Sequence, residues 1–332
     1  MKLIHPCKFG WDTMTWAPNL HSVNPYRGCA YNCSYCWARD IATRFKRLPR
    51  SGYWKDVEVA PGFEQPTVVE HYPTHYLALY SEQWGGKPKS ILLSATCDPY
   101  PPIEENTGYT RACLNSLLIG SMVKHQVFIL TKSPLVLRDV DLLKQLNAWV
   151  GMTLTDPGDG AAQGWEPGAP PNPERIKALK QLHEAGVRTY ASLEPWLTSG
   201  GLDVTRPSEI IDATSGFVDY FIIGSWNKGG RPVREAIPIY KKFLPEVEGL
   251  LKARGKPYWI KPELRRVAEM KPIDEVQVGL HCPYQYQYKQ WYGCGSPGQD
   301  FGAATEPCKV VDMDRCPLLK VLRGPPPFAT KS

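Results

Sequence analysis

The sequence predicts an α/β fold in which parallel strands alternate with covering helices, as an incomplete (β/α)6 barrel. Two observations carry this prediction. Short, continuously apolar runs recur along the middle of the chain, as expected of strands buried on both faces of a parallel sheet. A stretch with helical patterning follows most of these runs, and no long period repeats, which excludes a solenoid or a propeller.

The first predicted strand lies near residues 23–26. Later apolar runs predict strands at 90–95, 126–130, 149–154, 187–193 and 218–223, with 257–260 as a candidate for one more. Helices are predicted at 37–47, 107–122, 134–146, 173–185, 207–214 and 234–253. In such a fold chemistry gathers at the C-terminal ends of the strands, so functional residues are expected in the loops that follow them.

Two segments depart from this alternation and suggest three parts of the chain. Residues 1–22 form an N-terminal segment, and 23–270 form the core domain, which carries an aromatic-rich insertion at 49–89. Residues 271–332 form an irregular C-terminal extension that contains four cysteines. The 28 glycines and 32 prolines follow no collagen-like period, so they indicate turns and long ordered loops.

Composition narrows the class of protein. The chain has 332 residues, of which 42% are hydrophobic and 22% charged, which excludes a disordered or fibrous chain. Its N-terminus lacks the apolar run of a signal peptide, and its most apolar stretch, 114–123, is shorter than the roughly 20 residues that span a bilayer. We therefore expect a cytoplasmic protein without membrane association, in which clustered cysteines more often bind metal than form disulfides.

Three cysteines follow the first predicted strand in the stretch NPYRGCAYNCSYCWAR. Cys29, Cys33 and Cys36 have the spacing C-x3-C-x2-C and lie in a loop that opens a helix. Their thiolates suit a soft metal or an iron–sulfur cluster, whereas a structural zinc ion needs a fourth ligand, and no cysteine or histidine lies just downstream. A [4Fe–4S] cluster held by three cysteines keeps one iron open for another ligand. Buried structural thiols or a zinc knuckle are the alternatives.

The spacing, together with the aromatic Tyr35 before the last cysteine, resembles the signature of the radical S-adenosylmethionine (SAM) superfamily. Residues 94–104, 130–137 and 165–175 resemble stretches of radical SAM proteins related to spore photoproduct lyase. Residues 221–233 are similar to a phage-associated, uncharacterised branch of the family. The chain departs from photoproduct lyase in length and in several motifs, so thymine-dimer repair is not implied.

The resemblance implies a TIM-type radical SAM barrel, a [4Fe–4S] cluster and SAM. In this family the open iron binds the amino and carboxylate groups of SAM. One electron from a flavodoxin or ferredoxin-type donor then cleaves SAM to methionine and a 5′-deoxyadenosyl radical, which abstracts hydrogen from the substrate. The family contains lyases, oxidoreductases and transferases, and the sequence leaves the subclass open.

Family members hold SAM with polar groups at successive strand ends. Tyr35 is the residue expected near the adenine. Ser94, Ala95 and Thr96 end the second predicted strand, where the usual Gly-Gly-Glu is absent, so backbone carbonyls and the two hydroxyls would accept from the SAM ammonium group. Thr131 and Lys132 end the third strand. Lys132 is a candidate for the SAM carboxylate, and an ordinary surface lysine is the alternative.

The later strand ends add three candidates, and a thiol, Cys97, lies just beyond the second predicted strand. Thr153 is expected near ribose or substrate, and Ser225 near the adenine or the substrate. Glu194 ends an apolar strand, so it either binds ribose hydroxyls or substrate or forms a structural salt bridge. Photoproduct lyase has a cysteine in a comparable region that returns a hydrogen atom to the product radical, and the resemblance implies the same role for Cys97. The alternative for Cys97 is a small buried hydrophobic residue.

The C-terminal extension carries a second group of cysteines, Cys282, Cys294, Cys308 and Cys316. They could fold the segment around an auxiliary iron–sulfur cluster or around zinc, and unligated thiols are the third alternative.

The sequence does not identify the substrate. The lyase resemblance and the net charge of +6 favour a nucleic acid or nucleotide. A basic run near the last strand, Lys261, Arg265 and Arg266, is expected to form a solvated face. The alternatives are a radical SAM enzyme that acts on a small molecule or peptide with an auxiliary cluster, and a non-catalytic iron–sulfur or zinc module that binds nucleic acid.

Overall fold

The computed structural model describes residues 5–6, 20–39, 67–68, 90–93, 96–119, 124–228 and 231–270. Most of the insertion at 49–89 and all of the extension at 271–332 lie outside these ranges, with Ser94, Ala95, Cys282, Cys294, Cys308 and Cys316. None of the helices in the described ranges has the length and apolar character needed to cross a bilayer.

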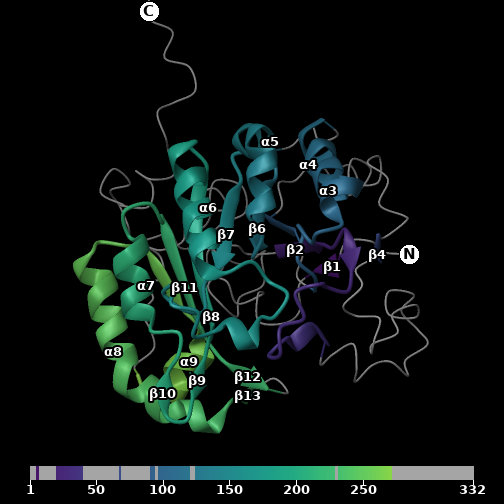
Figure 1. Cartoon of the computed structure of the whole chain (residues 1–332). Helices are drawn as coiled ribbons and strands as arrows, with labels where there is room; N and C mark the ends of the chain where they lie inside the picture. Colours follow the sequence, from purple (N-terminus) through teal and green to yellow (C-terminus); the bar gives the residue numbers. More distant parts are fainter. Residues whose placement is uncertain are drawn as a thin grey trace, which may run out of the picture.

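The centre of the fold is a sheet of eight strands in the order β1-β2-β5-β6-β7-β8-β11-β14 (Figure 1). All neighbours from β2 to β14 are parallel, and only β1 pairs antiparallel with β2. The strands are β1 (His5–Pro6), β2 (Leu20–Val23), β5 (Ser90–Leu93), β6 (Gln126–Thr131), β7 (Trp149–Thr153), β8 (Arg188–Trp196), β11 (Tyr220–Ser225) and β14 (Tyr258–Ile260).

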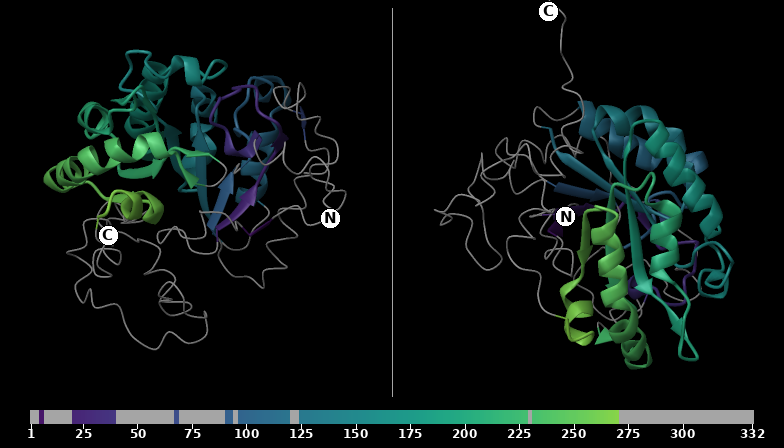
Figure 2. Two further views of the ribbon diagram at one scale, coloured as in Figure 1. Left: turned by 90° about the horizontal axis from the view of Figure 1, so that it is seen from below. Right: turned by 90° about the vertical axis from the view of Figure 1, so that its left-hand side faces the viewer.

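The helices between the strands lie together on one side of the sheet, as the views in Figure 2 show for α4 to α8. They are α3 (Glu104–Thr107), α4 (Tyr109–Ile119), α5 (Val140–Gln145), α6 (Asn172–Glu184), α7 (Pro207–Thr214), α8 (Ile237–Ala253) and α9 (Pro262–Val267). Short 3-10 turns, η1 (Pro134–Asp139), η2 (Gln163–Trp165) and η3 (Arg234–Ala236), precede some of them. Three two-residue ladders, β3 (Tyr26–Arg27) with β4 (Thr67–Val68), β9 (Thr198–Ser199) with β10 (Leu202–Asp203), and β12 (Asn227–Lys228) with β13 (Arg231–Pro232), complete the described elements.

This architecture confirms the predicted α/β fold class and adds the seventh parallel strand that 257–260 suggested. Several boundaries differ from the predictions, and β8 continues past the predicted end at residue 193 to Trp196. The first parallel strand ends at Val23, where we expected it to begin. The helix expected at 107–122 begins at Tyr109, because Gly108, whose φ of 61° lies in the left-handed region, ends the short, unpredicted helix α3 just before it.

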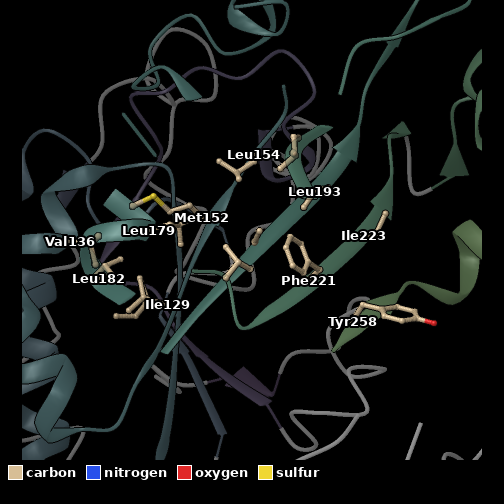
Figure 3. Packing of buried hydrophobic residues seen from close by; sticks show 14 of the residues in the cluster. Ile129, Val136, Met152, Leu154, Leu179, Leu182, Leu193, Phe221, Ile223 and Tyr258 are labelled. Carbon is tan, nitrogen blue, oxygen red and sulfur yellow. The ribbon is translucent and has the colours of Figure 1, made fainter. Parts of the chain in front are cut away.

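The core lies between the sheet and its helices. Met152 of β7 faces Leu179 and Leu182 of α6, and all three are fully buried (Figure 3). Within the sheet, the ring of Tyr190 on β8 lies across Gly151 of β7, and its hydroxyl donates to the Ile129 carbonyl on β6 at 2.8 Å. This contact connects three neighbouring strands, β6, β7 and β8. Because the three strands are parallel, their C-terminal ends lie at the same edge of the sheet.

Candidate functional site

The three clustered cysteines lie in one loop, residues 28–36, called the cysteine loop below. It follows β3, and a helical turn begins directly after it at Trp37. Gly28 starts the loop with a φ of 75°, a conformation that glycine adopts without strain. Cys29, Cys33 and Cys36 belong to one small apolar cluster with Tyr31, Tyr35 and Ala169. The loop therefore keeps the three thiols together in a largely water-excluded place.

The surroundings of the thiols differ in charge. Burial raises the pKa of Cys29, and the nearby Asp98 carboxylate raises it further. Burial also raises the pKa of Cys33, although the Lys132 ammonium opposes this rise. Thiolates here therefore need a cation or a metal to compensate them, which suits the donor set of an iron–sulfur cluster. No three His, Cys, Asp or Glu side chains of the described residues form a ligand set for a single metal ion, whereas in a cluster each cysteine binds its own iron.

Asp98, in the bend that follows β5, binds the end of β6 near the cysteine loop. Its carboxylate accepts hydrogen bonds from the Thr131 hydroxyl at 2.6 Å, the Lys132 amide at 2.8 Å and the Tyr100 amide at 2.9 Å. Thr96, one of the predicted SAM residues, is held on the other side, where its amide and its hydroxyl both lie 3.0 Å from the Asn24 side-chain oxygen. Cys97 follows Thr96 in the same bend and is partly exposed.

Lys132 extends toward the cysteine loop and is not an ordinary surface lysine. Its side chain is only 15% exposed, and its ammonium lies 5.7 Å from the centre of the Tyr35 ring and 3.8 Å from Glu166 Oε1. Burial lowers the pKa of Lys132, but negative charge at Cys33 and Glu166 outweighs this effect and raises it above its ordinary value. Lys132 is therefore a cation at neutral pH, placed beside Cys33 and Tyr35.

Glu166 is the site residue whose individual role the sequence did not indicate. It is 1% exposed, and its Oε2 accepts from Arg175 at 2.6 Å and from the Thr155 hydroxyl at 3.0 Å. Its Oε1 accepts from the Tyr35 hydroxyl. Burial acts to raise the pKa of Glu166, but Lys132 and Arg175 reverse the effect and hold it below its ordinary value. The only sequence signal was the resemblance of the 165–175 stretch to family members.

Glu194 pairs with a lysine that we expected at the surface. Lys261, directly after β14, is 6% exposed, and its ammonium lies 2.6 Å from Glu194 Oε1. The Glu194 side chain reaches across β11 at Gly224, where an added Cβ would lie 2.6 Å from the Glu194 Cδ. Arg265, a second member of the basic run, is also buried and pairs with Glu248, which leaves only Arg266 exposed.

The remaining predicted residues lie along the same edge of the sheet. The Ser225 hydroxyl donates to the Asn227 side chain at 3.1 Å, and the buried Thr153 accepts an Arg175 hydrogen bond at its carbonyl oxygen at 3.0 Å. The rings of Trp165 and Trp226 meet edge to face, 4.9 Å apart. This contact links the cysteine-loop side of the edge to the side that holds Glu194 and Ser225.

Comparison with models of known protein families shows to which superfamily this chain is related. The model of the radical SAM superfamily matches residues 23–194, which contain the cysteine loop and five of the seven parallel strands, two of them in part. The chain belongs to the radical SAM superfamily. An uncharacterised protein of Methanocaldococcus jannaschii is 32% identical over 200 residues, which are 60% of this chain and 67% of that protein. An uncharacterised protein of Acidianus two-tailed virus is 28% identical over 174 residues, 51% of this chain and 53% of the viral protein.

Among solved structures, this radical SAM chain resembles spore photoproduct lyase. A variant of that enzyme with bound AdoMet and dinucleoside spore photoproduct has a TM-score of 0.54 and 12% identity, and the match covers 78% of each chain. At this identity the similarity concerns the fold alone. An uncharacterised Mycobacterium tuberculosis protein is 25% identical over 186 residues. The chain spans between half and two thirds of the length of these curated relatives.

Proposed function

We propose that this chain is a radical SAM enzyme in which Cys29, Cys33 and Cys36 hold a [4Fe–4S] cluster. The observation that carries the proposal is the cysteine loop itself, which gathers three thiols beside a lysine cation at the C-terminal edge of a parallel sheet. When bound, the cluster and SAM supply reductive cleavage of the SAM sulfonium and a carbon radical that removes hydrogen from the substrate.

The residues around the loop would divide the binding of SAM among them. Lys132 is suited to the SAM carboxylate, because it is a largely buried cation whose charge acts on the neighbouring Cys33 thiol. Tyr35 would lie near the adenine. Thr96, with Ser94 and Ala95, would accept from the ammonium group.

Farther along the edge, Glu194 would bind ribose hydroxyls or substrate, with Thr153 and Ser225 close to the same groups. We propose Cys97, which is partly exposed, as the thiol that returns a hydrogen atom to the product. The three-part division of the chain at 22 and 270 belongs to this proposal, as does an auxiliary iron–sulfur cluster or zinc ion on the four cysteines of the extension.

For the substrate we propose a nucleic acid or nucleotide, and for the electron donor a flavodoxin or ferredoxin-type protein in the cytoplasm. Support for the substrate comes from the net charge of +6 and from Trp165 and Trp226, two partly exposed rings that a base could stack on. Salt-dependent binding to DNA or RNA tests the substrate class, since phosphate contacts weaken steeply as salt rises. Salt-independent binding of a small molecule or peptide would contradict it.

The activity is tested by anaerobic reconstitution of the full chain with iron and sulfide, followed by a 5′-deoxyadenosine assay with SAM and dithionite. About four irons per chain are expected for one cluster, and about eight if the extension holds another. Cys36→Ser should abolish both iron binding at the loop and 5′-deoxyadenosine formation. Cys113→Ser, which changes a buried thiol on α4, is the matched control and should retain both. A fully reconstituted protein that cleaves no SAM would contradict the proposal.

A further inference from the structure

The cysteine loop rests on a segment from a distant part of the chain. Residues 165–169, called the supporting segment below, follow β7 and lie against the loop backbone. The Ser34 amide donates to the Trp165 carbonyl at 2.9 Å, and the Gly168 amide donates to the Tyr31 carbonyl at 3.1 Å. Together with the Tyr35–Glu166 hydrogen bond, these contacts join the two segments at three successive points.

Gly168 makes this approach sterically possible. A Cβ added there would lie 2.4 Å from the Ala30 carbonyl oxygen and 3.1 Å from the Tyr31 Cα, which are backbone atoms that cannot swing aside. Gly164, four positions earlier and equally exposed, has open space at the corresponding position. Glycine is therefore required at 168 by the cysteine loop and not by the conformation of the connection itself.

The supporting segment is itself held by the preceding turn and by α6. The Asp156 carboxylate accepts from the Gly158 amide at 2.7 Å and the Ala162 amide at 2.9 Å, which closes the preceding turn. Arg175, fully buried on α6, binds Glu166 Oε2 at 2.6 Å and the Pro170 carbonyl at 2.7 Å. One oxygen of Glu166 thus faces Arg175, while the other faces Tyr35 and Lys132.

We infer that the supporting segment positions the cysteine loop for its cluster, with Gly168 and Glu166 as positioning residues. Neither residue supplies a ligand. They act by holding the loop backbone and Tyr35 in one arrangement before iron arrives, as partners of metal ligands commonly do. The inference rests on the proposed function, because it takes Cys29, Cys33 and Cys36 as the cluster ligands.

The first test compares Gly168→Ala with Gly164→Ala in the full chain, reconstituted anaerobically with ferrous iron and sulfide. Iron loss to a ferrous chelator is followed by absorbance. We expect iron to leave Gly168→Ala about 10-fold faster than wild type, the lower end of the effect of changing residues that support metal ligands, and to leave Gly164→Ala at the wild-type rate.

The second test separates positioning from general stability. Glu248 has the same kinds of partner as Glu166, namely the Tyr258 hydroxyl, Arg265 and Lys252, but lies on α8 away from the loop. Glu166→Gln and Glu248→Gln should both lower the melting temperature of the iron-free protein. Only Glu166→Gln should accelerate iron loss, by about 10-fold, and change the electron paramagnetic resonance spectrum of the reduced cluster.

The outcomes distinguish the two proposals. If the wild-type loop binds no iron, the proposed function fails. If the wild type binds iron while Gly168→Ala and Glu166→Gln keep its rate of iron loss and its spectrum, the inference is overturned and the proposed function stands. Should Gly168→Ala fail to fold, Tyr35→Phe, which removes only the hydroxyl that reaches Glu166, takes its place with the same expected acceleration.

Discussion

Two lysines illustrate how single residues acquire roles that depend on their partners. Lys132 and Lys261 both follow strands of the parallel sheet, and each contacts a glutamate at the same edge. They differ in geometry, because Lys261 makes a close pair at 2.6 Å while Lys132 lies 3.8 Å from Glu166 and remains directed at the cysteine loop. The close pair of Lys261 stabilises the Glu194 carboxylate, whereas Lys132 presents its positive charge to the cysteine loop.

Replacing Lys132 should weaken SAM binding selectively. A charge-assisted hydrogen bond contributes about 1.5–3 kcal/mol, so Lys132→Met should raise the dissociation constant of SAM by about 10- to 150-fold in calorimetry on the reconstituted protein. An analogue without the carboxylate, decarboxylated SAM, should bind wild type and variant alike. Lys180→Met, at an exposed cation paired with Glu184, is the control. Equal loss for both ligands would argue against a carboxylate contact.

Replacing Lys261 should destabilise the fold itself. Lys261→Met leaves the largely buried Glu194 carboxylate without its cation, and we expect the free energy of unfolding to fall by about 2–4 kcal/mol. Lys241→Met breaks an ion pair with Glu269 that is exposed on both sides, so it should lower this free energy by less than about 1 kcal/mol. Urea unfolding of the iron-free protein measures both values. Similar values for the two variants would show that the Glu194 pair is solvated.

At the scale of elements, the packing of β7 against β8 depends on one glycine. An added Cβ at Gly151 would lie 2.2 Å from the Tyr190 ring, whose hydroxyl is fixed to Ile129. Gly151→Ala should therefore lower the free energy of unfolding by about 3 kcal/mol or more, the upper range for overpacking. Gly164→Ala, in open space, should change it little. A melting temperature unchanged in Gly151→Ala would mean that the Tyr190 ring can move aside.

Elements whose formation depends on local patterns were predictable. Apolar runs located the parallel strands from β5 to β14, and the helices predicted at 173–185 and 207–214 correspond closely to α6 and α7. The cysteine spacing located the candidate ligands because they lie within eight residues of one another. The division between α3 and α4 was missed, since Gly108 lies inside an otherwise helical pattern.

Features that depend on distant partners were not predictable. Glu166 and Tyr35 are 131 positions apart, and Lys261 and Glu194 are 67 positions apart, so no local pattern reveals either pair. The basic run after β14 was interpreted as a solvated face for the same reason. Two of its three members pair with acidic residues that the fold brings to them, and no spacing in the sequence indicates this.

At the scale of the whole molecule, the buried Glu248 carboxylate contributes to the response of stability to acid. Burial acts to raise the pKa of Glu248, but Arg265 and Tyr258 outweigh it and hold it below the ordinary value of 4.5. A carboxylate with a lowered pKa binds protons less readily in the folded than in the unfolded state. Its stabilising contribution is present above the ordinary value and is lost as the pH falls below it.

The contribution of Glu248 to the stability of the iron-free protein should therefore be lost as the pH falls below about 4.5, and Glu248→Gln should reduce the slope of stability against pH in that range. Urea unfolding at a series of pH values gives the slope directly. Glu246→Gln, at an exposed position on the same helix, is the matched control and should keep the wild-type slope. Identical slopes for all three proteins would mean that other groups control acid unfolding.

The contact between the cysteine loop and the supporting segment also orders events during synthesis. The ligands leave the ribosome early, but the residues that support them follow more than a hundred positions later. A nascent chain thus exposes its cysteines long before it can enclose them, so cluster insertion has to wait until α6 has emerged. Ribosome-stalled chains of increasing length should acquire stable iron only once Arg175 has left the exit tunnel.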